Sequence, residues 1–263
     1  RRDRFAIAGA GVVEVSCVDA ANPFVFVRAE ALGLKGTETE AIEGQAGIKS
    51  VLEAIRCRAA VELGITATEE EATRRSQAVP KVAVVAAPQP YPALSGRAVA
   101  AGDADLLARM MSMGTLHRAY AVSGAVATAG AAMIPGTVAY DLVPEEARRR
   151  DLLRIGHPGG VIEVGAVIES RAYDVTYREA LLGRTARRDP PEAQLDAPRR
   201  QPPGLLRARV AAEAHRPLAL LEVRFQQIRG VPVVGVAAVR VGHQLFEDAA
   251  GVFADDFFAQ LRH

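Results

Sequence analysis

One segment constrains the fold more than any other: residues 112–133, SMGTLHRAYAVSGAVATAGAAM, have no continuous polar face. Alanine and methionine favour helix, so the composition predicts a single helix from Ser112 to Met133, despite Gly124 and Gly130. Pro135 and Gly136 would then end it. A helix that is apolar all round must be buried on every side, inside a protein or in a bilayer.

The same segment argues against a membrane span. A spanning helix needs about 20 strongly apolar residues in a row. Here His117, Arg118, Ser123 and Thr128 interrupt the run, and alanine and glycine supply much of the rest. Small residues let other backbone approach closely, which suits a tight protein interior. The segment therefore predicts a central buried helix, and no membrane association is expected.

The composition excludes some classes of partner. Among 263 residues there are 32 basic and 31 acidic side chains, so a general attraction to nucleic acid or anionic lipid is not expected. A hydrophobic content of 49% is ample for one large domain or two ordinary ones. Two cysteines, Cys17 and Cys57, cannot build a disulfide framework, and no signal peptide is visible. A cytoplasmic location is expected.

Strand patterns surround the predicted helix. VVEVSCVDAANPFVFVRA indicates two strands around a turn, KVAVVAAP a strand after Pro80, LLRIGHPGGVIEVGAVIE two strands joined by a tight turn, and AYDVTYREALL a further strand. GIKSVLEAIRCRAAVELG has the helical period and ends at Gly64, a plausible C-cap. Strands around an apolar helix predict an α+β fold with a sheet curled around that helix.

The C-terminal part changes character. We predict one domain over residues 1–188, a Pro-rich linker over 189–205 and a tail of unknown nature over 206–263. Within the tail, LALLEVRFQQI and GVPVVGVAAVRVG indicate strands, and EDAAGVFADDFFAQL indicates a short helix.

Several motifs together resemble a known family. DAANPFVFV, PKVAVVA, SMGTLHRAYAVSGAV, IPGTV, RIGHPGG and GRTARR resemble, in that order, the C-terminal half of the PrpF family, over residues 11–188. That family includes 2-methylaconitate cis–trans isomerases and 4-oxalomesaconate tautomerases. The resemblance implies the diaminopimelate epimerase-like fold, in which two domains each wrap a β-barrel around a central helix. This chain would be the second domain.

The resemblance also implies an activity: a cofactor-independent isomerisation of unsaturated dicarboxylic or tricarboxylic acids. In the family, the active site lies between the two domains, and the acid–base groups are mainly a lysine and a cysteine of the first domain. No catalytic residue can therefore be assigned here, and the chain is expected to be incomplete on its own. We expect a small carboxylate substrate, and either a homodimer or pairing with a separate N-terminal half.

Two alternatives stay open. One is an amino-acid epimerase or racemase of the same fold. The other is a non-catalytic, truncated domain.

Substrate-binding candidates come first from the predicted helix. Ser112, Met113 and Gly114 would open it, and free amides at a helix N-terminus bind carboxylates. His117 would lie one turn further on. The competing interpretations are that Gly114 merely allows close packing and that His117 is a satisfied core residue.

The remaining candidates lie in turns and at a strand start. His157, Pro158, Gly159 and Gly160 form a tight turn whose amides can approach an anion, or that simply joins two strands. Asn22 can bond a ligand or shape its turn, and Lys81 can neutralise a carboxylate or remain solvated. No spacing of His, Cys, Asp or Glu indicates a metal site, and no glycine-rich loop indicates a nucleotide site.

Overall fold

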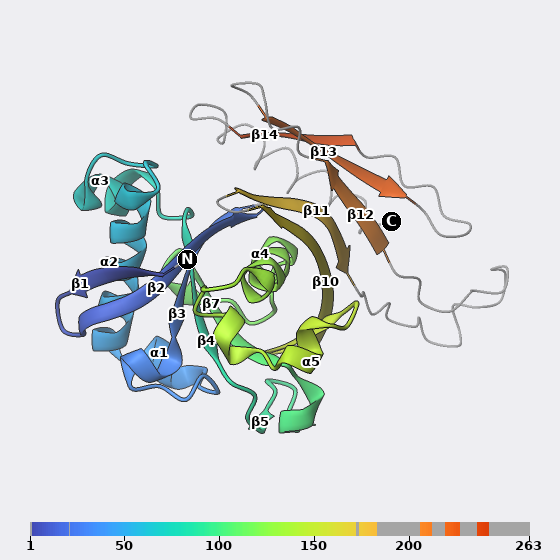
Figure 1. The fold of residues 1–263 in the computed structure, drawn as a ribbon. Coiled ribbons are helices and arrows are strands. Elements are labelled where there is room, and N and C mark those ends of the chain that lie inside the picture. The colour runs from blue at the N-terminus through green and yellow to red at the C-terminus, as the bar shows by residue number, and fades with distance from the viewer. Residues whose placement is uncertain are drawn as a thin grey trace, which may run out of the picture.

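The computed structural model describes residues 2–20, 22–171, 174–182, 206–211, 219–226 and 236–241. A long sheet curls around one helix, α4 (Val122–Met133), while α2 (Ala46–Glu62) lies against the outer face of the sheet (Figure 1). The predicted α+β fold, a β-barrel wrapped around a central helix, is confirmed.

The strands are, in chain order, β1 (Asp3–Ile7), β2 (Gly11–Ala20), β3 (Asn22–Arg28), β4 (Lys81–Ala86), β5 (Tyr91–Pro92), β6 (Ala98–Val99), β7 (Leu106–Ser112), β8 (Thr115–Leu116), β9 (Leu153–His157), β10 (Gly160–Arg171), β11 (Asp174–Leu182), β12 (Leu206–Ala211), β13 (Ala219–Gln226) and β14 (Val236–Val241). The shorter helices are η1 (Ala29–Leu32), α1 (Glu40–Gly44), α3 (Glu69–Arg75), η2 (Ala101–Asp103), η3 (Tyr140–Leu142) and α5 (Glu145–Arg148).

The main sheet runs in the order β1-β2-β3-β4-β7-β9-β10-β11-β12-β13-β14, with β8 paired to β7. Neighbours are antiparallel except for β3 with β4 and β7 with β9, which are parallel. The parallel pairs matter for the site, because they make β3 and β4 begin at the end of the barrel where β7 and β9 finish.

Two apolar cores lie on the two faces of the sheet. In β3, Phe24 and Phe26 face α4, while Val25 and Val27 face the side of α2, and all four are fully buried. A helix covers each face, so this strand shows a continuous apolar run instead of an apolar–polar alternation. The inner core around α4 is the one that shapes the site.

The central helix is buried as predicted but begins later than predicted. Residues 124–132 of α4 are all buried, and the first helical residue is Val122, ten positions after Ser112. The prediction of a helix from Ser112 was wrong because β7, LLARMMS, is buried on both faces. An apolar run of that kind has no period that separates strand from helix.

Met113 and Gly114 form a hairpin turn, not a helix start. They join β7 to β8, with Ser112 paired to Thr115 across them. Both have positive φ angles, 49° and 74°. A two-residue hairpin loop with both central residues in the left-handed region matches the twist of the flanking strands.

Other predictions hold. The predicted N-terminal hairpin is formed by β2 and β3, and the predicted strand after Pro80 is β4. The two strands around the GHPGG turn are β9 and β10, and the predicted strand near residue 180 is β11. Gly64 ends α2 with a φ of 67°, its amide bonded to Val61 O at 3.0 Å. In the tail, β13 and β14 confirm the two predicted strands, whereas the predicted linker and final helix lie outside the described residues.

Within the part of the chain that the structure describes, no helix is long and apolar enough to cross a membrane.

Candidate functional site at the mouth of the barrel

Most of the candidate residues lie at one end of the barrel, which we call the mouth. There β3 begins at Asn22, β4 begins at Lys81, β7 ends at Ser112 and β9 ends at His157. The β10 strand starts at the same end, at Gly160, which pairs with His157. Residues far apart in the sequence therefore meet because the parallel and antiparallel pairings bring these strand ends to one edge.

The register directs these side chains inward. Phe24, which packs against α4, is paired with Lys81 on the neighbouring strand, so Lys81 lies on the same inner face. Asn22 lies two residues before Phe24 on that face. Ser112 lies opposite Lys81, since Val82 pairs with Met111. Asn22, Lys81 and Ser112 thus lie together on the rim of the barrel interior.

Lys81 is a half-buried amine without an acidic partner in the described part of the chain. Its Nζ donates hydrogen bonds to Ser112 Oγ at 3.1 Å and to Ala78 O at 3.3 Å. Burial lowers the pKa of Lys81. An amine held only by neutral oxygens retains the capacity to bind a carboxylate, which is the role that the sequence suggested.

The N-terminus of α4 opens at the same place. A Cβ built on Gly124 would lie 2.8 Å from Met110 Sδ and 3.3 Å from Phe24 Cζ, so the first helical turn lies beside the inner rim. No side chain caps the helix at Ala121, and Val122 is 57% exposed. The first amides of a helix lack intrahelical acceptors and carry its positive dipole end.

The helix start to which the anion-binding prediction applies lies further along the chain than predicted. The physical reasoning for amides at the start of the buried helix applies to residues 122–124, not to Ser112, Met113 and Gly114. The prediction that those three residues open the helix was wrong. Ser112 lies at the mouth, where its Oγ accepts a hydrogen bond from Lys81 Nζ. Met113 and Gly114 form an exposed hairpin tip, and their amides do not belong to a helix.

His117 is also not on the helix. It follows β8, its amide donates to Met110 O at 2.8 Å, and its ring Nδ1 contacts Ala119 O. It is half-buried beside the strand that carries Ser112. His117 therefore lies at the mouth as a residue that follows β8, and not as a residue of the helix, which was the prediction.

His157 lies on the inner face with Leu153 and Ile155 of the same strand. Its ring centroid is 6.0 Å from that of Tyr120, a buried residue just before α4. A Cβ built on Gly159 would lie 3.4 Å from Arg118 O. The turn therefore lies against the segment that leads into α4. The register places His157 about four residues along β7 from Ser112, roughly 13 Å.

The electrostatics of His157 favour a neutral ring. Burial, with added contributions from Arg109 and His117, lowers the pKa of His157 to about 4. Gly159 N–H donates to His157 Nδ1 at 3.1 Å, so the ring hydrogen of the neutral form is on Nε2. The ring can thus donate a hydrogen bond without carrying charge.

Tyr91 and Arg109 support the turn and were not identified from the sequence. Tyr91 Oη lies 2.9 Å from His157 O and 2.5 Å from Gly160 O, and Pro158 O accepts from the Leu94 amide at 2.8 Å. Tyr91 and His157 are 66 residues apart, and Arg109 lies inside an apolar strand. No local sequence pattern links them.

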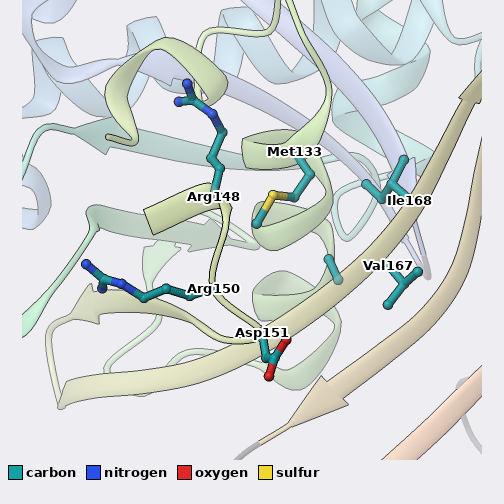
Figure 2. A pocket seen from close by; sticks show the side chains of 7 residues that line it. Met133, Arg148, Arg150, Asp151, Val167 and Ile168 are labelled. Carbon is teal, nitrogen blue, oxygen red and sulfur yellow. The ribbon is translucent and has the colours of Figure 1, made fainter. Parts of the chain in front are cut away.

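A cavity of about 400 Å³ lies at the opposite end of the barrel, which we call the far end. Its lining includes Met133, the last residue of α4, with Arg148, Arg150 and Asp151 (Figure 2). The guanidinium groups point away from Met133 and are already bonded, that of Arg148 to Tyr140 O and Val143 O and that of Arg150 to Asp105. Within the described residues, both of these guanidinium groups are therefore held by protein acceptors.

Among the described residues, no group of three or more His, Cys, Asp or Glu side chains is arranged to hold a metal ion. Cys57 is buried, and burial raises the pKa of both Cys57 and Cys17.

A barrel around a buried helix, with helix amides, a lysine and a neutral histidine at one mouth, is a diaminopimelate epimerase-like domain. Comparison with known proteins gives the family: residues 1–189 match PrpF protein, and the chain belongs to the PrpF family.

Two relatives and one solved structure illustrate the similarity. The chain is 41% identical over 180 residues to the 3-methylitaconate isomerase of Eubacterium barkeri, covering 68% of this chain and 46% of that protein. It is 36% identical over 186 residues to the 2-methyl-aconitate isomerase of Cupriavidus necator, covering 70% and 46%. The crystal structure of methylitaconate-delta-isomerase matches with a TM-score of 0.62 and 36% identity, covering 67% of this chain and 49% of that one.

The chain therefore spans about half the length of the curated relatives that it matches.

Proposed function

We propose that this chain forms one half of an isomerase that acts on unsaturated dicarboxylic or tricarboxylic acids. The enzyme would either shift the double bond along the carbon chain or interconvert its cis and trans forms. Methylitaconate and methylaconitate, in the names of its relatives, are acids of this class. The observation that carries the proposal is the mouth. There an uncapped helix start and Lys81, which has no acidic partner among the described residues, lie on the same rim, and both are suited to bind carboxylates.

The chemistry assigns a limited role to this half. Shifting a double bond next to a carboxylate requires a base that removes an allylic proton and an acid that returns a proton at the other end of the allyl system. Negative charge builds up on the carboxylate while the proton is absent. The amides at the start of α4 and Lys81 would bind the carboxylates and stabilise that charge.

We propose that His157 also stabilises the negative charge that builds up on the carboxylate. The neutral ring can donate a hydrogen bond from Nε2–H to the oxyanion that develops on the substrate. Asn22 and Ser112 lie on the same rim and would orient the substrate. From the resemblance, we propose that the proton-transferring groups lie on a first domain that faces the mouth, contributed by the same protein, a second copy or a separate half. We further propose that the protein acts in the cytoplasm.

The test is an isomerisation assay that follows the ultraviolet absorbance of 2-methylaconitate or 3-methylitaconate. The full chain is assayed alone and then with a separately expressed first domain of a PrpF relative. We expect no measurable turnover by the chain alone, because opposed acid–base groups and shielding from water need both halves. Turnover should appear on reconstitution, and Lys81→Met should reduce it by about tenfold or more.

Turnover by the chain alone would show that the two-half account is wrong. Absence of both turnover and carboxylate binding after reconstitution would overturn the isomerase proposal itself.

A further inference from the structure

His157 is held in one tautomer by its own turn. The Gly159 amide donates to Nδ1 at 3.1 Å, which requires that nitrogen to be unprotonated. The other ring nitrogen, Nε2, has no partner within the described residues. A fixed tautomer with an unpaired N–H on the inner face of the barrel is a directed hydrogen-bond donor.

The turn that carries His157 is anchored from the outer face of the sheet. Tyr91 belongs to the outer core, and its hydroxyl lies within hydrogen-bonding distance of the carbonyls of both residues that close the turn, His157 and Gly160. Gly156 provides the room for this approach. A Cβ built there would lie 3.1 Å from Tyr91 Oη and 2.6 Å from Leu107 Cδ2.

Arg109 supports Tyr91 and adds a buried positive charge. Its guanidinium carbon lies 4.8 Å from the centroid of the Tyr91 ring, and Nη1 donates to Gly156 O at 3.3 Å. The side chain is fully buried, and its other donors reach the carbonyls of Thr37, Glu38 and Ala108. Among the described residues it forms no salt bridge, so its charge is not cancelled by a paired carboxylate.

We propose that Tyr91 and Arg109 are positioning residues that keep His157 as a neutral, single-tautomer hydrogen-bond donor directed at the substrate. They act through the backbone and the electric field, because they lie on the opposite face of the sheet from the imidazole. The inference rests on the proposed function only in taking the ligand at the mouth to be the substrate.

Within the described residues, the titratable groups that act on His157 oppose a second proton on its ring. Arg109 lies behind it on β7, and His117 and Arg118 lie in the segment that leads into α4. Tyr91 and Tyr120 are buried phenols whose pKa values burial raises, so they stay uncharged. Burial together with Arg109 and His117 lowers the pKa of His157 to about 4.

The experiment is a pH titration of the full chain labelled with ¹⁵N-histidine, recorded by long-range ¹H–¹⁵N correlation, which reports tautomer and pKa for each ring. His157→Gln assigns the resonance. In the unmodified chain we expect the Nε2–H tautomer alone and titration near pH 4. In Tyr91→Phe the turn loses the hydroxyl that contacts the carbonyls of His157 and Gly160, so the tautomers should mix and the pKa of His157 should rise towards its ordinary value of about 6.5.

A second pair of variants separates charge from packing. Arg109→Gln should raise the pKa of His157, whereas Arg109→Lys keeps the positive charge and should raise it less. Tyr140→Phe is the matched control for Tyr91→Phe, since Tyr140 lies in η3 at the far end and should leave His157 unchanged. Circular dichroism establishes that each variant is folded.

The proposal is overturned if His157 of the unmodified chain titrates near 6.5 or carries its hydrogen on Nδ1. It is equally overturned if a folded Tyr91→Phe chain keeps the original tautomer and pKa. These measurements need no substrate, so they are decisive whether or not isomerase activity is found. Their failure would leave the proposed isomerase function standing.

Discussion

The mouth and the far end of the barrel satisfy their polar groups in opposite ways. At the far end, the carboxylate of Asp105 is 3% exposed and pairs with both Arg150 and Arg154. Thr137 Oγ1 donates to Ala131 O at the end of α4. At the mouth, the start of α4 has no side-chain cap, and Lys81 is bonded only to neutral oxygens.

This difference supports the proposal that the mouth, and not the far end, binds the ligand. Buried polar groups in proteins are almost always paired. Within the described residues, the amine of Lys81 has no acidic partner and the start of α4 has no side-chain cap, so both retain the capacity to bind a carboxylate. The far end contains a cavity of about 400 Å³, yet the arginines that line it are bonded to protein groups. Our proposal for the site therefore rests on these polar groups and not on the volume of a cavity.

The largest expected effect compares cations at the two ends. Replacing both Arg150 and Arg154 by methionine would leave the buried Asp105 carboxylate without a cationic partner, and should cost about 3–5 kcal/mol of unfolding free energy. Lys81→Met is the matched control at the mouth and should change stability by less than about 1 kcal/mol. Urea unfolding measures both. Equal losses at the two ends would abolish the distinction.

An acid titration of stability sharpens the picture of the mouth. Because the pKa of His157 is about 4 in the folded chain and about 6.5 when unfolded, only the unfolded chain takes up this proton as the pH falls below 6.5. The contribution to stability is complete above pH 6.5 and is lost progressively down to pH 4, up to about 3 kcal/mol.

His157→Gln should remove that part of the pH dependence. Thermal or urea unfolding of both chains between pH 7 and pH 4 makes the comparison. Parallel stability curves for the two chains would show that His157 is not a buried neutral ring.

Replacing a glycine by alanine should have smaller effects on stability, and these should have opposite signs in α4 and in α2. Gly124→Ala should cost about 1–3 kcal/mol, because the new Cβ would lie 2.8 Å from Met110 Sδ. Gly47→Ala in α2 meets nothing within 4 Å and should stabilise the chain by about 0.5–1 kcal/mol. Should Gly124→Ala prove neutral in a thermal unfolding experiment, the contact between α4 and the rim is looser than described.

Much of the fold follows from the sequence because burial leaves a clear record. The apolar run of the central helix predicted the burial that residues 124–132 show, and the period of α2 and its final Gly64 predicted both the helix and its end. The boundary at Ser112 failed because a strand buried on both faces looks like a buried helix, and Met113-Gly114 is an unusual pair for a hairpin turn.

The candidate site could be predicted only in part. Lys81 and the His157 turn were identified because a lysine before an apolar strand and a Gly/Pro turn are local features. The roles of Tyr91 and Arg109 depend on contacts across dozens of residues, and the true helix start depends on where the buried strand ends. Pairing between strands supplies this information, and residue patterns do not contain it. The assigned binding roles themselves remain predictions.

The most direct test of the central claim is a binding map of the full chain by ¹H–¹⁵N NMR, titrated with cis-aconitate as a carboxylate probe. The account predicts shifts at the amides of residues 122–124, at Lys81 and at the His157 ring, with none around Met133 and Asp151. Lys81→Met should weaken binding about tenfold, whereas Arg150→Met should not change it. Shifts confined to the far end, or binding that is insensitive to Lys81, would contradict the assignment of the mouth as the carboxylate site.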